Sequence, residues 1–214
     1  MARLYDISPP LGASIAVFPG DSPLSREVLL EHARGDNLTL STLRSTVHLG
    51  AHADAPSHYQ PDGETIDRCE LSRYLGPCQL LSVSAGADGL VGKAVAERID
   101  QPRVLFRTAS YPDPNHFNDD FVALAPELVD ALAERAVRLV GVDTPSVDPA
   151  RSKALPAHLR FAARGILILE GLVFDGVPDG SYQLIALPLK LVGFDASPVR
   201  AVLIDRPGDC LVCD

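Results

Sequence analysis

Residues 126–143 read PELVDALAERAVRLVGVD, and this stretch predicts the fold class of the chain. Pro126 is suited to the first turn of a helix, where its missing N–H leaves no hydrogen bond unmade. The apolar face of that helix would carry Leu128, Val129, Leu132 and Ala133. The largely apolar run at 137–143 follows at once and is typical of a strand that is buried on both faces. A helix joined directly to such a strand indicates an α/β protein.

The same alternation continues on both sides of this stretch. Further helices are predicted over 88–99, where Asp88 can cap the first turn, and over 155–164. Hydrophobic and β-branched runs predict strands over 37–47, 78–84, 103–107, 166–170, 182–187 and 199–204. Because strands and helices alternate in the middle and strands dominate the ends, we predict a single α/β domain, 1–214, with a mixed sheet.

The composition is that of an ordinary soluble globular protein. Hydrophobic residues make up 46% and charged residues 22% of the 214 residues, which argues against disorder and leaves enough chain for a substantial core. The formal net charge of −9 would repel phosphate backbones, so nucleic acid is not an expected partner. The sequence shows neither a membrane-spanning run nor a signal-peptide core, and we expect a cytoplasmic protein without a membrane partner.

The cysteines do not form the framework of a secreted protein. Cys69 and Cys78 are predicted to be buried thiols, because four unevenly spaced cysteines are too few for a disulfide scaffold. Cys210 and Cys213 have CxxC spacing but lie at the end of the chain, where no helix can follow them. We therefore interpret the spacing of this pair as chance or as tail chemistry, and not as the redox motif that opens a helix.

Three of the six histidines fall within the eleven residues 48–58, which read HLGAHADAPSH. Imidazole nitrogens and carboxylate oxygens are the usual ligands of zinc and similar metals, provided that several converge at about 2 Å. On a straight strand, four residues span roughly 13 Å, too far for His48 and His52 to share an ion. A helical turn or a tight loop, which Gly50 and Pro56 favour, would bring them together.

The alternative interpretation of this segment is a polar surface loop with exposed histidines. The small residues around Asp54 argue against it, because they leave room for a ligand and offer little bulk for packing. We therefore expect a metal-binding or catalytic role. His32 and His116 lie outside any motif and are expected to be ordinary surface residues.

Residues 141–148, GVDTPSVD, follow the predicted buried strand. Loops at such strand ends commonly carry function in α/β proteins, which would make Asp143 a site residue. The other interpretation is a turn in which Asp143 and Ser146 bond to the backbone. We favour the turn and expect the loop to border the pocket.

The 48–58 segment resembles the signature His-x-Gly-Thr-His-x-Asp-x-Pro-x-His of the cyclase-type metal-dependent hydrolases. It differs at one fixed position, where Ala51 stands in place of Thr. Seven further segments resemble the bacterial kynurenine formamidase (arylformamidase) branch of that superfamily: 6–11, 18–23, 74–78, 141–148, 166–171, 184–190 and 195–203. The likeness runs nearly from end to end, and it implies a swivelling β/β/α fold and a homodimer.

The resemblance also implies a two-zinc site. Its metal ligands would be His48, His52, Asp54, His158 and Glu170, with the two carboxylates bridging and His158 on the second ion. Without the resemblance, Glu170 would be interpreted as a solvated carboxylate at a strand end. Manganese is the alternative metal, because a set of His and carboxylate ligands also accepts it.

The activity implied is hydrolysis of N-formyl-L-kynurenine to L-kynurenine and formate, with His58 as proton donor and acceptor. An imidazole with a pKa near 6.5 suits that task, although His58 could instead be a further ligand or support one. The chain has no GxSxG motif, which argues against a serine hydrolase.

The substrate is less closely specified than the reaction, because Phe18 stands where the family has a substrate-contacting Trp. Stacking against an aryl ring would survive this exchange, whereas a hydrogen bond from an indole N–H would not. The alternatives are hydrolysis of isatin or another cyclic or aryl amide and, from a different class, a non-catalytic metal-binding protein.

Overall fold

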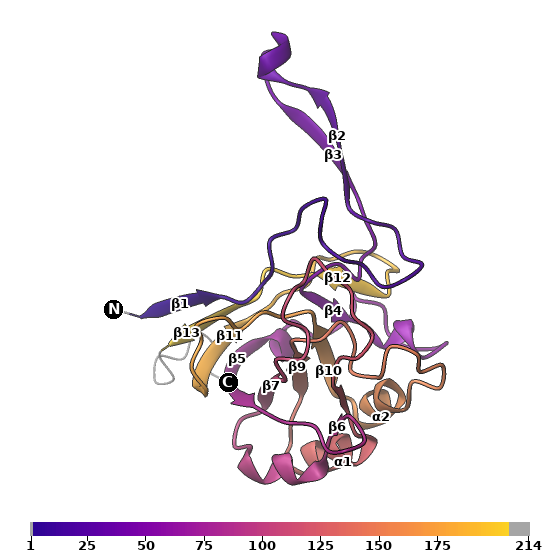
Figure 1. Cartoon of the computed structure of the whole chain (residues 1–214), viewed down its shortest axis with the longest axis vertical. Coiled ribbons are helices and arrows are strands. Elements are labelled where there is room, and N and C mark those ends of the chain that lie inside the picture. The colour runs from indigo at the N-terminus through magenta and orange to yellow at the C-terminus, as the bar shows by residue number, and fades with distance from the viewer. Residues whose placement is uncertain (1, 206–214) are drawn as a thin grey trace.

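The computed structural model describes residues 2–205, which form a single α/β domain built on a curled nine-stranded mixed sheet (Figure 1). The strand order is β1-β13-β11-β5-β7-β9-β10-β4-β12. The strands are β1 Arg3–Asp6, β4 His52–Asp54, β5 Leu75–Ser82, β7 Arg103–Arg107, β9 Leu139–Val142, β10 Leu167–Glu170, β11 Gly180–Ile185, β12 Ala196–Pro198 and β13 Val202–Asp205. Strands β5, β7, β9 and β10 pair in parallel, and the flanking pairs are antiparallel, as the predicted mixed sheet requires.

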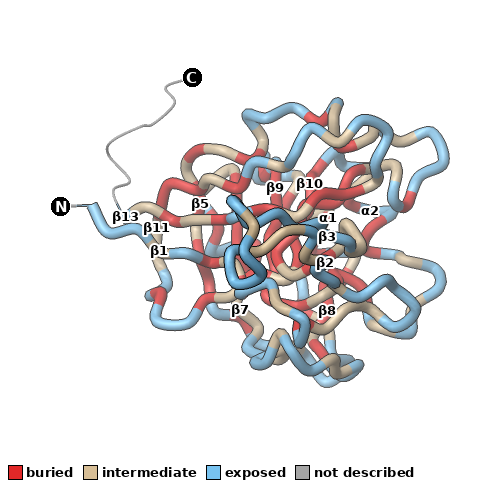
Figure 2. The backbone as a smooth tube through the Cα atoms, turned by 90° about the horizontal axis from the view of Figure 1, so that it is seen from above, coloured by how far each residue is buried: buried red, intermediate tan, exposed pale blue. Residues whose placement is uncertain are grey.

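Two α-helices, α1 (Pro126–Glu134) and α2 (Pro156–Arg164), pack against each other on one side of the central strands (Figure 1). Along β7, successive side chains enter opposite cores, as the two-residue period of a strand requires. Phe106 joins the core under the helices, whereas Leu105 joins the core that the curled sheet encloses. Buried residues therefore concentrate in the central strands (Figure 2).

The prediction of a helix over 88–99 is wrong. Its first half contains the short strand β6 (Leu90–Val91), which pairs with β8 (Ala123–Leu124), and its second half is a 3₁₀ helix, η4 (Lys93–Arg98). Asp88 Oδ1 accepts a hydrogen bond from the Leu90 N–H at 3.1 Å, so it closes a turn instead of capping a helix. Pairing with β8 thus overrides the helical pattern of the segment.

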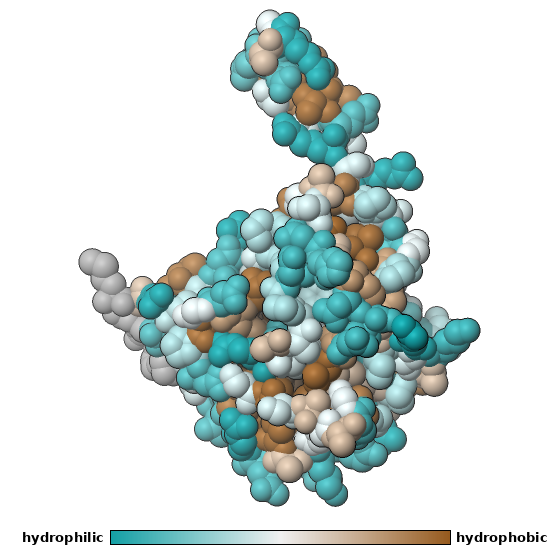
Figure 3. All heavy atoms as spheres, in the orientation of Figure 1, coloured by the Kyte–Doolittle hydropathy of each residue, from teal (hydrophilic) through white to brown (hydrophobic). Residues whose placement is uncertain are grey.

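A two-stranded hairpin, which we call the arm, projects from the domain (Figure 1). It consists of β2 (Ser25–Leu30) and β3 (Leu40–Arg44), joined through the 3₁₀ helix η1 (His32–Arg34). The strand predicted over 37–47 is therefore real but shorter, and it lies outside the main sheet. The arm exposes Leu29, Leu38, Leu40 and Leu43, and hydrophobic side chains gather on its outer half (Figure 3).

Several remaining predictions can be compared with the structure. Cys69 and Cys78 are buried free thiols, as expected, whereas Cys210 and Cys213 lie outside the described residues. His32 and His116 are exposed, as expected for surface residues. None of the helices within 2–205 has the length and hydrophobicity needed to cross a membrane. The cytoplasmic location stays a prediction.

Candidate metal centre

Strands β4 and β10 bring three of the expected ligands to one face of the sheet. The strands pair antiparallel, with Glu170 opposite His52 and Ile168 opposite Asp54. Because side chains two residues apart on a strand share a face, His52 and Asp54 project to the same side, and Glu170 joins them from the neighbouring strand. All three side chains are buried.

A tight turn brings His48 back to this face. Gly50 adopts a φ of +54°, and the rings of His48 and His52 lie 5.1 Å apart between centroids. The backbones of Gly50 and Gly171 approach so closely that a Cβ on Gly171 would lie 2.1 Å from the Gly50 carbonyl oxygen. The expected tight loop is therefore present, but it lies before β4 and not within it.

His158 lies in the first turn of α2 and completes the group of side chains that we call the cluster: His48, His52, Asp54, His158 and Glu170. The carboxylate of Asp148 accepts hydrogen bonds from the backbone N–H groups of Ala157 and His158, both at 3.0 Å. It also accepts one from His158 Nδ1 at 2.7 Å. Asp148 thus satisfies free N–H groups at the helix start and fixes the imidazole ring in one step.

The carboxylates of Asp54 and Glu170 lie between two groups of histidines. His48 and His52 form one group, and His158 forms the other. Asp54 Oδ1 lies 3.1 Å from His48 Nδ1 and 3.5 Å from His52 Nε2, while Asp54 Oδ2 lies 3.5 Å from His158 Nε2. Glu170 repeats the pattern, with Oε2 at 3.4 Å from His52 Nε2 and Oε1 at 3.4 Å from His158 Nε2. Ligand atoms around one tetrahedral zinc are about 3.3 Å apart, given bonds of about 2.0 Å. Each carboxylate could therefore hold one oxygen on each of two metal ions.

Unpartnered polar atoms also fit a metal at this position. His52 Nε2, Asp54 Oδ1 and Asp54 Oδ2 are buried and have no hydrogen-bond partner among the described residues. Buried polar atoms are normally satisfied, because leaving them unpaired is costly. A cation accepting their lone pairs would satisfy all three atoms.

Each histidine of the cluster has one ring nitrogen near Asp54 or Glu170 and donates a hydrogen bond through the other one. The acceptors are the Gly50 carbonyl for His52 Nδ1 at 2.9 Å, Asp148 for His158 Nδ1 at 2.7 Å, and Asp195 Oδ2 for His48 Nε2 at 2.9 Å. Such an acceptor fixes the tautomer and leaves the other nitrogen free to bind a metal. The three rings are therefore oriented for metal binding.

The electrostatics of the cluster favour positive charge. Burial by itself raises the pKa of Asp54, but the imidazoles of His158 and His48 beside its carboxylate hold that pKa well below its usual value. Burial lowers the pKa of His48, yet Asp54 and then Asp195 raise it to about 9. Burial likewise opposes the rise in the pKa of His158, which Asp148, Asp54 and Glu170 cause. The buried carboxylates thus attract protons or metal ions to the histidines.

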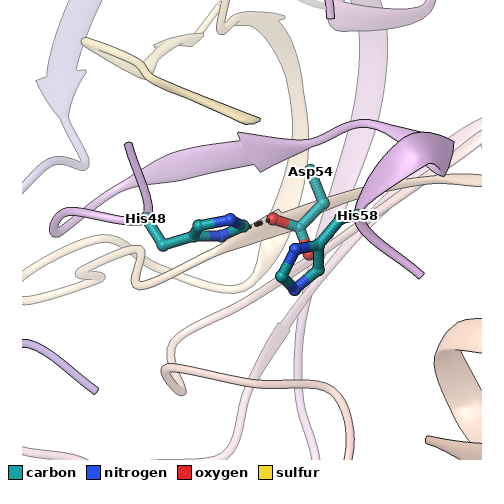
Figure 4. Close-up of side chains that lie close together, drawn as sticks. All are labelled: His48, Asp54 and His58. Carbon is teal, nitrogen blue, oxygen red and sulfur yellow. Dashed lines mark ion pairs between the residues drawn. The ribbon is translucent and has the colours of Figure 1, made fainter. Parts of the chain in front are cut away.

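His58 stands beside this cluster at the end of the 3₁₀ helix η2 (Pro56–His58). Its ring lies 4.1 Å from that of His48, and its side chain is 34% exposed. Ligand atoms of His48, Asp54 and His58 lie within 4.8 Å of one another (Figure 4). The ion pair of His58, however, is with Asp195. His58 therefore faces solvent more than the other histidines of the site.

A cavity of about 600 Å³ opens over the cluster, and the histidines of the site and Glu170 line its floor. Phe18, Tyr111 and Phe117 line it as well. The rings of Phe18 and Phe117 meet edge to face at 5.2 Å, and those of Tyr111 and Phe117 at 6.3 Å. The volume lies within the range of small-molecule sites, and one wall is aromatic.

The loop after β9 borders the cavity, as expected, and its side chains bond to the backbone as we favoured, but only Ser146 does so within the loop, whereas Asp143 bonds to the segment that follows β7. The carboxylate of Asp143 accepts hydrogen bonds from the backbone N–H groups of Thr108 and Ala109, at 3.0 and 2.8 Å. Ser146 Oγ accepts one from the Asp148 N–H at 3.1 Å. Both Asp143 and Ser146 line the cavity, as expected for a loop at its rim.

Sequence reasoning missed two carboxylates, Asp148 and Asp195. Asp148 ends the GVDTPSVD segment that we interpreted through Asp143 and Ser146, and its distance from His158 along the chain gave no sign of contact. Asp195 opens the segment DASPVRAVL, which we used only for resemblance. The signal in both cases was an acidic residue in a segment that carried the family likeness.

This fold is found in solved structures of metal-dependent hydrolases. A potential metal-dependent hydrolase with cyclase activity is 30% identical and superposes with a TM-score of 0.83 over 96% of this chain and 99% of that chain. A predicted metal-dependent hydrolase from Bacillus stearothermophilus is also 30% identical, with a TM-score of 0.81 over 96% and 100%. Isatin hydrolase A from Labrenzia aggregata, bound to benzyl benzoate, shares the fold at 22% identity, with a TM-score of 0.76 over 95% and 93%.

The sequence itself shows the family to which this protein belongs. The family described as "Putative cyclase" matches residues 5–149, which is more than half of the chain. This protein therefore belongs to the cyclase family and has the fold of its metal-dependent hydrolases.

Proposed function

We propose that this protein hydrolyses N-formyl-L-kynurenine to L-kynurenine and formate. The observation that carries the proposal is the pair of buried carboxylates, Asp54 and Glu170, each with one oxygen toward each of two histidine groups. That arrangement lies at the floor of a cavity with an aromatic wall. It is suited to a two-metal hydrolase that acts on an aryl amide.

We assign the metal ligands from these contacts. His48 Nδ1, His52 Nε2 and Asp54 Oδ1 would hold one ion, and His158 Nε2 the other, with Asp54 and Glu170 bridging. Zinc is the metal that we propose, with manganese as the alternative. Two such ions would activate a water molecule and neutralise the charge that develops on the formyl oxygen.

His58 would carry the proton of the reaction. The oxygen of water adds to the formyl carbon, the C–N bond breaks, and a proton from water must reach the departing aryl amine. His58 lines the cavity and holds one ring nitrogen, Nδ1, against Asp195 at 3.3 Å. The other nitrogen, Nε2, could take up and return that proton.

Phe18 and Phe117 would bind the aryl ring of the substrate. Their edge-to-face packing at 5.2 Å leaves a rigid apolar surface on the cavity side. Aromatic pairs contribute about 0.5–1.5 kcal/mol beyond the area that they bury, so this wall would favour an aryl amide over an alkyl amide.

Isatin is the second candidate substrate. The similarity to isatin hydrolase A favours it, because that protein shares the fold over 95% of this chain. A cyclic amide keeps its amine attached after the ring opens, so the same proton transfer would release no second product. The two substrates therefore test one site with two leaving groups.

Turnover of both substrates by metal-loaded protein tests the proposal. Protein stripped with a chelator and reloaded with zinc or manganese should hydrolyse formylkynurenine with a higher kcat/KM than isatin. Faster turnover of isatin would replace the proposed substrate. A protein that binds metal tightly but hydrolyses neither amide would support the non-catalytic alternative.

We also propose that a second copy of the chain is the protein partner. An isolated two-stranded hairpin is marginally stable in water, and the arm exposes 68% of Leu43 and 48% of Leu40. A partner covering these leucines would stabilise the arm. Light scattering coupled to gel filtration measures the mass, and a monomer at micromolar concentration would contradict the homodimer.

A further inference from the structure

Asp195 contacts two histidines of the site at once. Its Oδ2 lies 2.9 Å from His48 Nε2 and 3.3 Å from His58 Nδ1. Because an ionised carboxylate only accepts hydrogen bonds, both ring nitrogens must carry a proton to donate to it. This contact therefore joins an assigned metal ligand to the assigned proton carrier.

The backbone around Asp195 is fixed to the segment that carries both histidines. Asp195 precedes β12, in which Ala196 pairs with Asp54 of β4. The Asp195 carbonyl oxygen accepts a hydrogen bond from the Ala55 N–H at 2.9 Å. The carboxylate is thus held on a strand end, while its side chain stays 45% exposed at the cavity.

We propose that Asp195 is a positioning residue for His58, an inference that rests on the proposed function. By accepting the Nδ1–H, Asp195 would select the tautomer in which Nε2 carries the lone pair. Nε2 could then take a proton from the attacking water and give it to the departing amine nitrogen, so the ring ends each cycle unchanged. The same oxygen would keep the ring of His58 packed at 4.1 Å from that of His48.

Asp148 provides a matched control, because it also accepts a hydrogen bond from one ligand histidine. Its contacts are His158 and the backbone N–H groups at the start of α2, and it forms no ion pair with His58 among the described residues. Asp148→Asn and Asp195→Asn remove the same charge from the two sides of the cluster. They differ in whether His58 loses its partner.

The first measurement needs no turnover. In metal-free protein with ¹⁵N-labelled histidine, at a pH where the His58 ring is neutral, the wild-type ring should show a protonated Nδ1 and an unprotonated Nε2. Asp195→Asn should shift the ring toward the Nε2–H form, whereas Asp148→Asn should leave the His58 shifts unchanged. An unchanged tautomer in Asp195→Asn would overturn the proposal, even if the proposed substrate proves wrong.

The second measurement follows turnover of formylkynurenine while the metal concentration is raised from substoichiometric to excess. Asp195→Asn should lower kcat by roughly 10²- to 10⁴-fold with little change in KM, as expected when a proton carrier is misplaced. Asp148→Asn should act through metal affinity, raising the metal concentration for half-maximal activity by about 10- to 100-fold. A kcat loss in Asp195→Asn that excess metal restores would mean that Asp195 serves only His48.

A double variant separates positioning from any independent effect. If Asp195 acts through His58, adding Asp195→Asn to His58→Ala should lower kcat by no further factor, because the residue acted upon is already gone. If the kcat losses of the two single variants multiply in the double variant, Asp195 and His58 act independently, which would contradict the inference. If wild-type protein turns over no amide, the proposed function fails while the tautomer measurement still decides the role of Asp195.

Discussion

The candidate metal site and the arm are built in opposite ways. In the cluster, His52, Asp54 and Glu170 sit on paired strands of the main sheet and are almost completely buried. In the arm, β2 and β3 pair only with each other among residues 2–205, and every residue of β3 is exposed. Geometry in the cluster is therefore fixed by many contacts, whereas the arm depends on a single pairing. Substitutions in the two regions should differ both in size and in what they affect.

The largest effect is expected from His52→Ala. His52 Nε2 lies within 3.5 Å of both Asp54 and Glu170, so its removal takes away the nitrogen between the two carboxylates. Metal analysis should show depleted protein, and turnover of formylkynurenine should fall to the limit of detection. Full metal content in this variant would contradict the ligand assignment.

A smaller loss is expected from His58→Ala. His58 makes its ion pair with Asp195, outside the buried part of the cluster. The variant should keep about two ions per chain and lose roughly 10²- to 10⁴-fold in kcat, the usual value of a positioned acid or base. If it is instead depleted of metal like His52→Ala, His58 is a ligand and not the proton carrier.

Metal should stabilise the cluster in a pH-dependent way. In metal-free protein the pKa of His48 rises from 6.5 to about 9, so this group contributes stability below pH 6.5 that is lost as the pH rises toward 9. Bound metal replaces the proton, and metal affinity increases as protons leave the ligands. The rise in melting temperature caused by zinc should therefore grow between pH 6.5 and 9. A rise that shrinks over this range would contradict it, with chelator-treated protein as the reference at each pH.

The sequence predicted the cluster better than the arm for a physical reason. Four of the six predicted metal-binding and proton-transferring residues lie within eleven positions, where a local turn and a short strand suffice to bring them together. The contacts of Asp195 cross 137 to 147 positions of the chain and depend on the β4–β12 pairing, which no local pattern reveals. Likewise, the run at 37–47 predicts a strand but not its partner, so its place outside the main sheet could not be foreseen. The resemblance supplied His158 and Glu170, because residue patterns alone left Glu170 as a solvated carboxylate.

Phe18→Ala should weaken substrate binding and leave the cluster intact. Phe18 lines the cavity and packs on Phe117 at 5.2 Å, away from the buried carboxylates. Lost stacking should raise KM for formylkynurenine by roughly 10-fold with a smaller change in kcat, the pattern of lost uniform binding. Phe18→Trp provides a control that keeps an aromatic ring. Equal kinetic constants in wild type and Phe18→Ala would show that this wall does not bind the substrate.

The smallest effect on the chemistry is expected in the arm. Leu43 exposes 68% of its surface, so Leu43→Arg removes little packing within one chain and should change the free energy of unfolding of a monomer by less than about 0.5 kcal/mol. If a second copy covers the arm, the charge would be buried there, and the dimer should dissociate at concentrations where wild type stays associated. Metal content should remain unchanged, because the substitution lies outside the cluster. Leu4→Arg, on the exposed face of β1, is the matched control for an added charge, since Leu4 is 61% exposed. A wild-type dimer that Leu43→Arg leaves intact would place the interface elsewhere on the domain.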